Sequence, residues 1–173
     1  MIATIPINLL RLVLLLAVQV LVFSNIHLSP MTAIYIYPLF IFLLPFETPR
    51  WLLLMLGFGF GLLLDVFLGT MGMHAAANTL LAYLRPYLIK IITPTSTEFE
   101  ISPSIYLQGA GWFLIYCGIG TLVHLLFYFL LESGTFYNLF YLLLRTVLST
   151  ALSVMFMMIF MYLFASSKKR RMT

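Results

Sequence analysis

Long, nearly uninterrupted runs of apolar residues fill most of this chain, and they constrain its fold more than any other feature. The first run, residues 9–23, contains only two polar side chains, Arg11 and Gln19. Over all 173 residues, 63% are hydrophobic and 8% are charged, whereas soluble domains carry about 25% charged residues. Because this number of charges cannot cover a water-facing surface, lipid must be the main solvent of the chain. The composition therefore predicts an integral membrane protein.

Six segments are apolar enough to cross a bilayer as helices, for which about 20 such residues are needed. They do not alternate between polar and apolar residues as the strands of a membrane β-barrel do. We therefore expect one all-α transmembrane domain, residues 1–173, built as a six-transmembrane-helix bundle. The expected spans are residues 6–26, 32–46, 51–68, 74–92, 104–131 and 138–165, with a basic tail at 166–173. The second span is short and contains Pro38, so whether it crosses the membrane fully stays open.

The basic residues orient this bundle. With the N and C termini in the cytoplasm, the inner side receives Arg11, Arg50, Arg85 and Lys90, while the three outer connections contain neither Lys nor Arg. Basic residues accumulate in this way on the cytoplasmic side of membrane proteins. The last basic cluster is expected to be a membrane-surface anchor and consists of Lys168, Lys169, Arg170 and Arg171.

Small residues form a stripe on the third expected helix. Residues four apart on an α-helix differ by only about 40° in direction, so they share one face. Small side chains let membrane helices approach each other closely. We therefore expect a helix-packing motif made of Gly57, Gly61, Asp65, Gly69 and Gly72. A nucleotide-binding loop is the alternative for residues 57–61, but no strand precedes this run and no lysine follows it.

Ionisable and amide side chains inside the expected helices form a second feature. A carboxylate in hydrocarbon costs on the order of several kcal/mol, so Asp65 must be paired, hydrated or protonated. Counting about 1.5 Å per residue places Arg145 at a similar depth, and we expect the two to pair. Separate hydrated cavities, or side chains that extend to the interface, are the alternatives. The candidate intramembrane polar network consists of Asp65, His74, Asn78, Arg85, His124 and Arg145.

Polar stripes on the first and last helices point the same way. They include Gln19 on the first helix, and Ser149 and Ser153 on the last. On the fourth expected helix, His74, Asn78 and Arg85 lie within about 40° of one another and share a face. Polar residues in lipid turn inward and hydrogen-bond across helices. The stripes therefore indicate a compact bundle or a face kept for a partner helix, and the sequence leaves both open.

The same residues do not form a known catalytic pattern. Zinc sites need three or four convergent ligands, usually with a short-spaced pair, which His74 and His124 do not provide. An intramembrane aspartic protease would need a second intramembrane aspartate beside Asp65. Cys117 is the single cysteine, so it offers neither a disulfide nor a cysteine-based metal site. We expect a protein that is not an enzyme and that has no cofactor or metal.

Residues 57–69, followed by Gly72, His74, Ala75 and Ala77, resemble the MreD family of bacterial rod shape-determining membrane proteins. The shared pattern is a glycine-spaced helix with an aspartate near its outer end, then a glycine-containing turn that opens an alanine-rich helix. The resemblance implies a fold similar to the S component of energy-coupling-factor transporters. It also implies a non-catalytic scaffold of the cell-elongation machinery in the bacterial inner membrane, which regulates cell shape and sidewall peptidoglycan synthesis.

Partners follow from the same resemblance. It implies binding to a single-span MreC-type protein and, indirectly, to MreB and the cell-wall synthases, within a lipid bilayer. No nucleic acid is expected as a partner, and a homodimer stays open. The alternative function is a substrate-binding subunit of a vitamin transporter, because S components share this architecture. Those proteins usually carry an Ala-x-x-x-Ala pattern on an early helix, where this chain has Ala17 alone.

Overall fold

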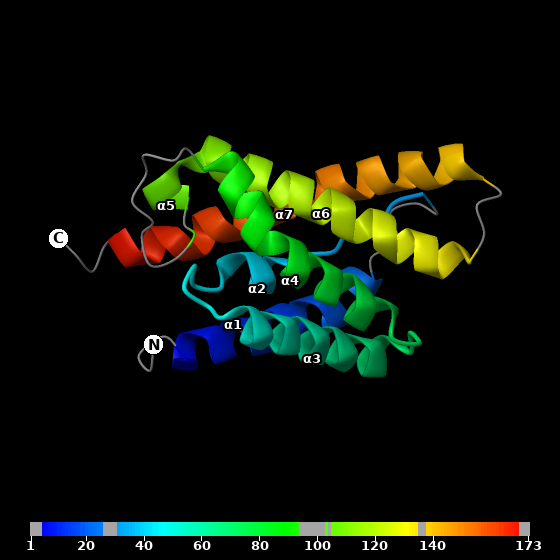
Figure 1. Ribbon diagram of the computed structural model, residues 1–173, viewed down its shortest axis with the longest axis horizontal. Coiled ribbons are helices and arrows are strands. Elements are labelled where there is room, and N and C mark those ends of the chain that lie inside the picture. Colours follow the sequence, from blue (N-terminus) through cyan, green and yellow to red (C-terminus); the bar gives the residue numbers. More distant parts are fainter. Residues whose placement is uncertain (1–4, 26–30, 94–102, 104, 135–137, 170–173) are drawn as a thin grey trace.

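The computed structural model describes residues 5–25, 31–93, 103, 105–134 and 138–169. These residues form helices and connecting segments, with no β-strand in the described part of the chain (Figure 1). The long helices are α1 (Ile5–Leu21), α3 (Arg50–Leu68), α4 (Met73–Ile92), α6 (Ala110–Ser133) and α7 (Leu139–Lys169). The short ones are the 3₁₀ helix η2 (Phe23–Asn25), α2 (Leu39–Leu43) and α5 (Ile105–Gln108).

In the part of the chain that the structure describes, four helical segments are long and apolar enough to cross a membrane. They are Pro6–Asn25, Arg50–Leu68, Ala110–Ser133 and Leu139–Leu163. Their outer faces carry large apolar side chains, such as Val66 and Leu163, which are 73% and 69% exposed. Such faces are stable in lipid and costly in water. The chain is therefore an all-helical membrane protein, as its composition predicted.

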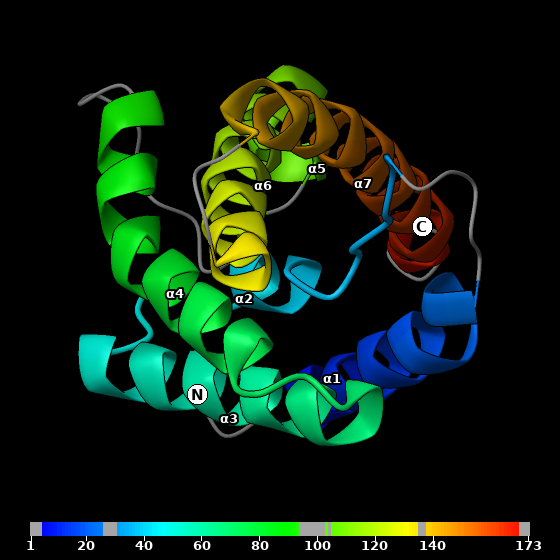
Figure 2. The ribbon, with the colours of Figure 1, turned by 90° about the vertical axis from the view of Figure 1, so that its right-hand side faces the viewer.

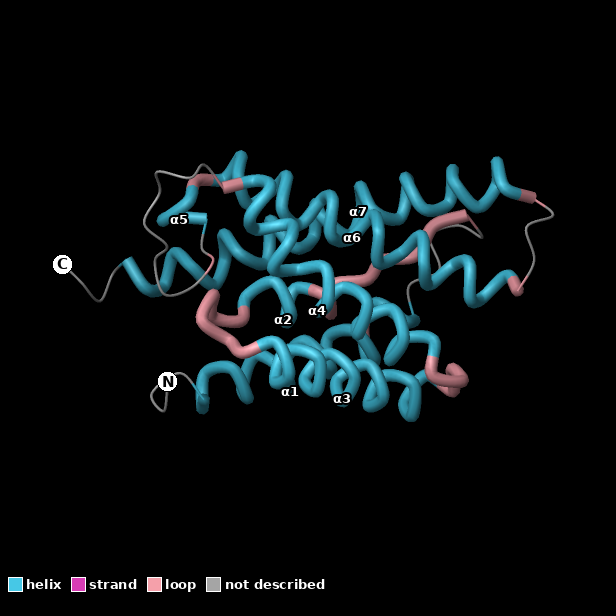
Figure 3. The backbone as a smooth tube through the Cα atoms, viewed as in Figure 1, coloured by secondary structure: helices cyan, strands magenta, loops and turns pink. Residues whose placement is uncertain are grey.

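The second predicted span is not a transmembrane helix. Within the predicted span 32–46, only the five residues of α2 are helical. Residues 33–36 have no helical structure, and Figure 3 shows the loop that enters the bundle before α2. Two prolines explain the short helix. Helix α2 begins after Pro38 and ends at Leu43, because proline disfavours helical geometry in the residue before it, and Leu44, which precedes Pro45, has an extended backbone.

This segment forms the centre of the protein. Figure 2 shows α2 enclosed by α1, α3, α4, α6 and α7. Residues 34 and 36–44 are all buried, and Leu39, Ile41 and Phe42 have no exposed surface. The segment is continuously apolar because protein surrounds it on every side, not because it faces lipid.

The fifth predicted span also differs from the structure. We expected one helix over residues 104–131, but Gly109 separates α5 from α6 with φ +88° and ψ +153°. Side chains other than glycine rarely adopt that conformation, so the helix breaks there. The remaining spans agree within a few residues, although α4 is less apolar than the four helices named above and α7 continues to Lys169.

The described chain begins and ends on one side of the bundle. In Figure 1 the start of α1 and the end of α7 lie at the left, and the turn between α3 and α4 lies at the right. Residues 44–50, which lead into α3, lie on the same side as the two ends.

Candidate functional site: the buried polar groups

Gly57 and Gly61 lie where α3 packs against α4. A Cβ atom on Gly61 would lie 2.5 Å from both the Cα of Ala75 and the backbone oxygen of His74. At Gly57 it would lie 2.9 Å from the Cβ of Ala82. Ordinary carbon contacts are about 3.5–4 Å, so only glycine permits this approach. The predicted packing role of these two glycines is confirmed.

Gly69 and Gly72, which we expected in the same motif, have another role. A Cβ at either position would meet no atom within 4 Å, but their φ angles are +69° and +80°. Both lie in the turn that ends α3 and begins α4. They belong to the motif because the turn needs left-handed backbone there, not because they pack against another helix.

Asp65 caps the start of α4. Its Oδ1 accepts hydrogen bonds from the Thr70 hydroxyl and, at 3.0 Å, from the backbone N–H of His74. Its Oδ2 accepts one from the N–H of Ala75 at 2.8 Å. The first amides of a helix have no partners within the helix and carry partial positive charge. A carboxylate from α3 therefore serves as the N-terminal cap of α4, and this explains how the charge is stable in the bundle.

The predicted Asp65–Arg145 pair is wrong. Arg145 pairs with Glu132, with 2.6 Å between Nη1 and Oε2, and its guanidinium lies 4.2 Å from the centre of the Phe129 ring. Depth along the membrane was a poor guide because the first backbone N–H groups of α4 donate hydrogen bonds to Asp65. Arg145 therefore lies apart from the rest of the predicted network.

A double-mutant cycle checks this separation. We expect Asp65→Asn and Arg145→Gln to be additive in the free energy of unfolding within about 0.5 kcal/mol, as for independent sites. The matched cycle of Glu132→Gln with Arg145→Gln should show a coupling of about 0.2–1 kcal/mol, typical of a partly exposed ion pair. Unfolding in mixed detergent micelles measures both cycles. Strong coupling between Asp65 and Arg145 would contradict the assignment.

Tyr37 joins the two histidines of the predicted network. Its hydroxyl lies 2.8 Å from Nδ1 of His74 and 2.7 Å from Nε2 of His124. The ring of His74 stacks on Tyr128, with centroids 4.6 Å apart. All of Tyr37 is buried. Sequence reasoning missed this residue, although a tyrosine in an apolar segment needs a hydrogen-bond partner when it is buried.

Arg85 binds backbone groups at the C-terminal end of α2. Its Nε donates to the Tyr116 hydroxyl at 2.9 Å, and its other nitrogens donate to the backbone oxygens of Leu44 and Pro45. Carbonyl groups at the C-terminal end of a helix carry partial negative charge. Arg85 is 1% exposed, so this contact satisfies a buried cation with backbone oxygens.

Asn78 shares the buried face of α4 with His74 and Arg85, as predicted, but it is not joined to them. It has no exposed surface, and neither atom of its amide has a hydrogen-bond partner in the described residues. The predicted network is thus divided: Arg145 pairs with Glu132, Asn78 has no partner among the described residues, and the other four residues belong to three structural units. Asp65 caps α4, the two histidines bind Tyr37, and Arg85 caps α2.

The extended segment 33–36 takes its hydrogen bonds from two neighbouring helices. Gln19 of α1 donates to the oxygen of Ile34 at 3.1 Å and accepts from the N–H of Ile36 at 2.9 Å. On the opposite side, Ser149 and Ser153 of α7 accept from the N–H groups of residues 33 and 35, at 3.1 and 2.9 Å. Backbone without helical hydrogen bonds must be satisfied in this way within a membrane. The polar stripes of α1 and α7 therefore bind this segment.

Replacing Gln19 tests this role. Gln19→Leu leaves the oxygen of Ile34 and the N–H of Ile36 without partners, each at about 1–3 kcal/mol. We expect the free energy of unfolding to fall by about 2–4 kcal/mol. Asn8→Leu on the same helix is the control, because among the described residues the side chain of Asn8 bonds only Arg11, and it should cost less than about 1 kcal/mol. Equal stability of the two variants would contradict the role of Gln19.

The expected surface anchor lies largely outside the described residues. Helix α7 continues to Lys169, but the side chains of Lys168 and Lys169, and all of Arg170 and Arg171, are not described. The anchor therefore stays a prediction.

The described residues contain no group of three His, Cys, Asp or Glu side chains placed to hold a metal ion. Comparison with known proteins gives no match to a family model, a curated protein or a solved structure. The chemistry of the buried polar groups is therefore the basis for a functional proposal. Asp65, Arg85, Gln19, Ser149 and Ser153 all serve backbone groups, so their evident role is to hold the bundle together.

Proposed function

We propose that this chain is a non-catalytic scaffold in the bacterial inner membrane, of the MreD type, which holds a single-span MreC-type protein. Through that protein it would act with MreB and the cell-wall synthases to regulate cell shape and sidewall peptidoglycan synthesis. The observation that carries the proposal is the use of the buried polar side chains. Those of Asp65, Arg85 and Gln19 bond backbone groups of the chain itself, as structural rather than reactive groups do.

The residues that resemble the MreD family also form one structural unit, which supports the proposal. Gly57 and Gly61 set the contact of α3 with α4, and Asp65 caps α4 across the turn containing Gly69 and Gly72. Each of these five residues thus has a physical reason to be there. A pattern of this kind would be retained by proteins that share this helical hairpin.

The filled centre favours a scaffold over a vitamin-binding subunit. A small-molecule site is concave and largely preformed. In this bundle α2 and the ring of Tyr37 occupy the middle, and Leu39, Ile41, Phe42 and Tyr37 have no exposed surface. Binding at the centre would require this segment to move out, at the cost of the hydrogen bonds made by Gln19, Ser149 and Ser153.

We further propose that the chain crosses the membrane six times with both ends in the cytoplasm. The crossings would be α1, the buried segment 31–46, α3, α4, α6 and α7. The common side of the start of α1 and the end of α7 in Figure 1 supports an even number of crossings.

A reporter that is fluorescent only in the cytoplasm should be active when fused to either end, and inactive when inserted at Met71, which is 97% exposed in the α3–α4 turn. Activity at Met71 would contradict this topology.

Depletion of the chain in the bacterium that encodes it tests the scaffold function. We expect cells to lose their rod shape, and the wild-type gene to restore it. His124→Gln combined with His74→Gln should restore shape as far as the protein accumulates, since the histidines have no catalytic role in the proposal. Normal shape after depletion, together with loss of uptake of a vitamin, would contradict the scaffold and support the transport alternative.

A further inference from the structure

We propose that an exposed surface at the start of α3 and the end of α4 binds the headgroup of an anionic phospholipid. This basic aromatic surface consists of Arg50 and Trp51 of α3 with Tyr83, Tyr87 and Lys90 of α4. The inference needs only that the chain lies in a membrane, so it does not depend on the scaffold function.

Arg50 links the two helices of the basic aromatic surface. Helices α3 and α4 lie close together near their connecting turn and diverge toward their other ends (Figure 2). At the divergent end, the guanidinium carbon of Arg50 lies 5.8 Å from the centre of the Tyr87 ring. The rings of Tyr83 and Tyr87 lie 5.7 Å apart. A cation within about 6 Å of an aromatic ring is attracted to its face, so Arg50 places its charge beside the two tyrosines of α4.

Lys90 adds a second positive charge to the same surface. It lies in the last turn of α4, three residues after Tyr87, and residues three apart are neighbours on a helix surface. Both cations are exposed, and no described carboxylate forms an ion pair with either of them. Glu47, the described acid closest to Arg50 in sequence, is included in this statement. Two charges without an acidic partner in the described chain attract an anion from outside it.

The rings of the surface indicate that this anion is a lipid headgroup. Trp51 is 64% exposed, and Tyr83 and Tyr87 are exposed as well. Such side chains have an apolar body and a polar tip, and they collect where headgroups meet acyl chains. Arg50 is also the first residue of a segment that is long and apolar enough to cross a membrane. The basic aromatic surface therefore lies at the boundary where headgroups are found.

The exposed face of α3 beyond Trp51 matches the acyl chains of such a lipid. Met55 and Phe58 follow one and two turns later, and both are exposed. A phosphodiester between Arg50 and Lys90 would have its acyl chains along these apolar residues. An anionic phospholipid thus complements the surface in both of its parts, whereas free phosphate complements only the cations.

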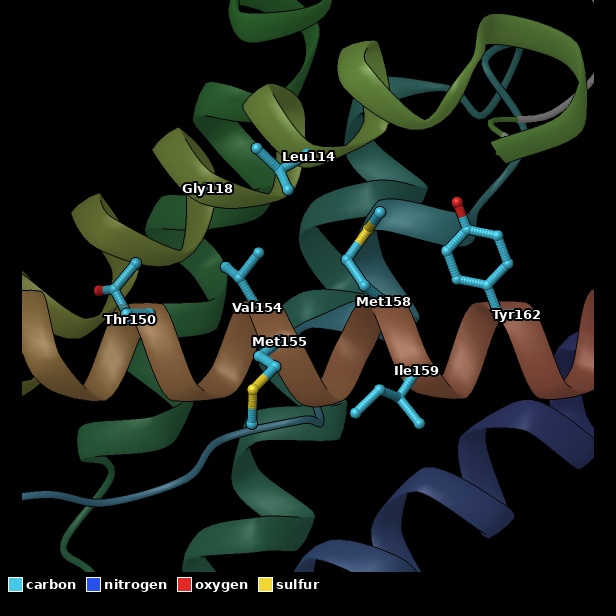
Figure 4. A pocket seen from close by; sticks show the side chains of 9 residues that line it. Leu114, Gly118, Thr150, Val154, Met155, Met158, Ile159 and Tyr162 are labelled. Carbon is cyan, nitrogen blue, oxygen red and sulfur yellow. The ribbon is translucent and has the colours of Figure 1, made fainter.

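The groove between α6 and α7 offers no such complementarity. Figure 4 shows its lining, which includes Leu114, Gly118, Val154 and Met158. Every described residue that lines it is uncharged. It can accept acyl chains, but it has no cation that would select an anionic headgroup. The groove therefore provides an internal control for the test.

Quenching of Trp51 fluorescence by brominated lipids measures the headgroup preference. The chain has two tryptophans, so Trp112→Phe leaves Trp51 as the single reporter. The full chain is placed in phosphatidylcholine bilayers, and brominated phosphatidylglycerol or brominated phosphatidylcholine is added. Each basic residue near an anionic lipid contributes about fivefold in binding, so we expect the anionic lipid to be preferred at least about fivefold. Equal quenching by the two lipids would overturn the proposal.

Two substitutions assign the preference to the basic aromatic surface. Arg50→Gln combined with Lys90→Gln should bring the two lipids to within about twofold of equal binding. Arg11→Gln is the matched control, because it also removes a positive charge, but from α1, where Arg11 bonds Asn8. It should change the preference less than about twofold. An unchanged preference in the double variant would overturn the proposal.

A reporter in the groove separates a local site from the general attraction of a basic protein. The chain has a net charge of +4, which attracts anionic lipid all around it. Leu114→Trp, combined with Trp51→Phe and Trp112→Phe, reports on the groove, where we expect a preference below about twofold. The same preference at the groove and at Trp51 would overturn the proposal.

Electron paramagnetic resonance of spin-labelled lipids repeats the comparison without replacing a tryptophan, so it decides the question if the Trp112→Phe variants fail to fold. The wild-type chain should immobilise a larger fraction of spin-labelled phosphatidylglycerol than of spin-labelled phosphatidylcholine. Arg50→Gln combined with Lys90→Gln should remove most of this difference, and Arg11→Gln should retain it. Equal immobilisation of the two lipids by the wild-type chain would overturn the proposal.

Discussion

Replacing Gly61 by leucine is expected to separate α3 from α4 and to lower the free energy of unfolding by at least about 3 kcal/mol, the upper range for overpacking. The first atom of the new side chain would lie 2.5 Å from backbone atoms of His74 and Ala75. Backbone cannot rotate away as the end of a flexible side chain can. The helices must therefore move apart, and Asp65 then loses its contacts with the first amides of α4.

Gly59→Leu is the control for this effect. It lies on the same helix and makes the same chemical change, but its added atoms enter open space. Leucine is also a better helix former than glycine by about 0.8 kcal/mol, so the control should be neutral or slightly stabilised. Reversible unfolding in mixed micelles measures both variants. Similar stability of Gly61→Leu and Gly59→Leu would show that α3 and α4 are not in close contact.

Asp65→Leu is expected to cost about 3 kcal/mol or more. It removes the acceptor for the backbone N–H groups of His74 and Ala75 and for the hydroxyl of Thr70, and each buried group left without a partner costs about 1–3 kcal/mol. Asp65→Asn keeps one oxygen as an acceptor, so its loss should be about half as large. The free energy of unfolding in the same micelles, together with proteolysis at the α3–α4 turn, measures these changes.

The sign of this result is informative. If Asp65 were only an unpaired charge in lipid, leucine would remove a desolvation cost and stabilise the protein. A stabilised Asp65→Leu variant would therefore contradict the capping role. Glu132→Leu is a suitable comparison, because Glu132 bonds Arg145 near the surface with its side chain 36% exposed, and it should cost less than about 1 kcal/mol.

The packing face of α3 could be predicted from sequence because its information is local, although the helix that packs against it could not. The spacing of Gly57, Gly61 and Asp65 defines one face of a helix whatever lies beside it. The same reasoning placed His74, Asn78 and Arg85 on a common buried face, where the structure has them. Helical periodicity thus identified which residues turn inward.

Partners of those residues could not be predicted in the same way. Asp65 binds backbone amides, and Arg85 binds backbone oxygens, and no residue type in the sequence marks such groups. The central segment was mistaken for a transmembrane helix because a short apolar run reads alike for a lipid-facing helix and for a buried, largely non-helical segment. Pro38 and Pro45 were the available signals, since two prolines seven residues apart leave little room for a helix.

Native mass spectrometry of the chain, released from the membranes of its bacterium, tests the central claim most directly. The scaffold account predicts a complex with the combined mass of this chain and one single-span MreC-type protein, with no small molecule bound. A chain that appears without any protein partner and carries a vitamin-sized molecule would contradict it.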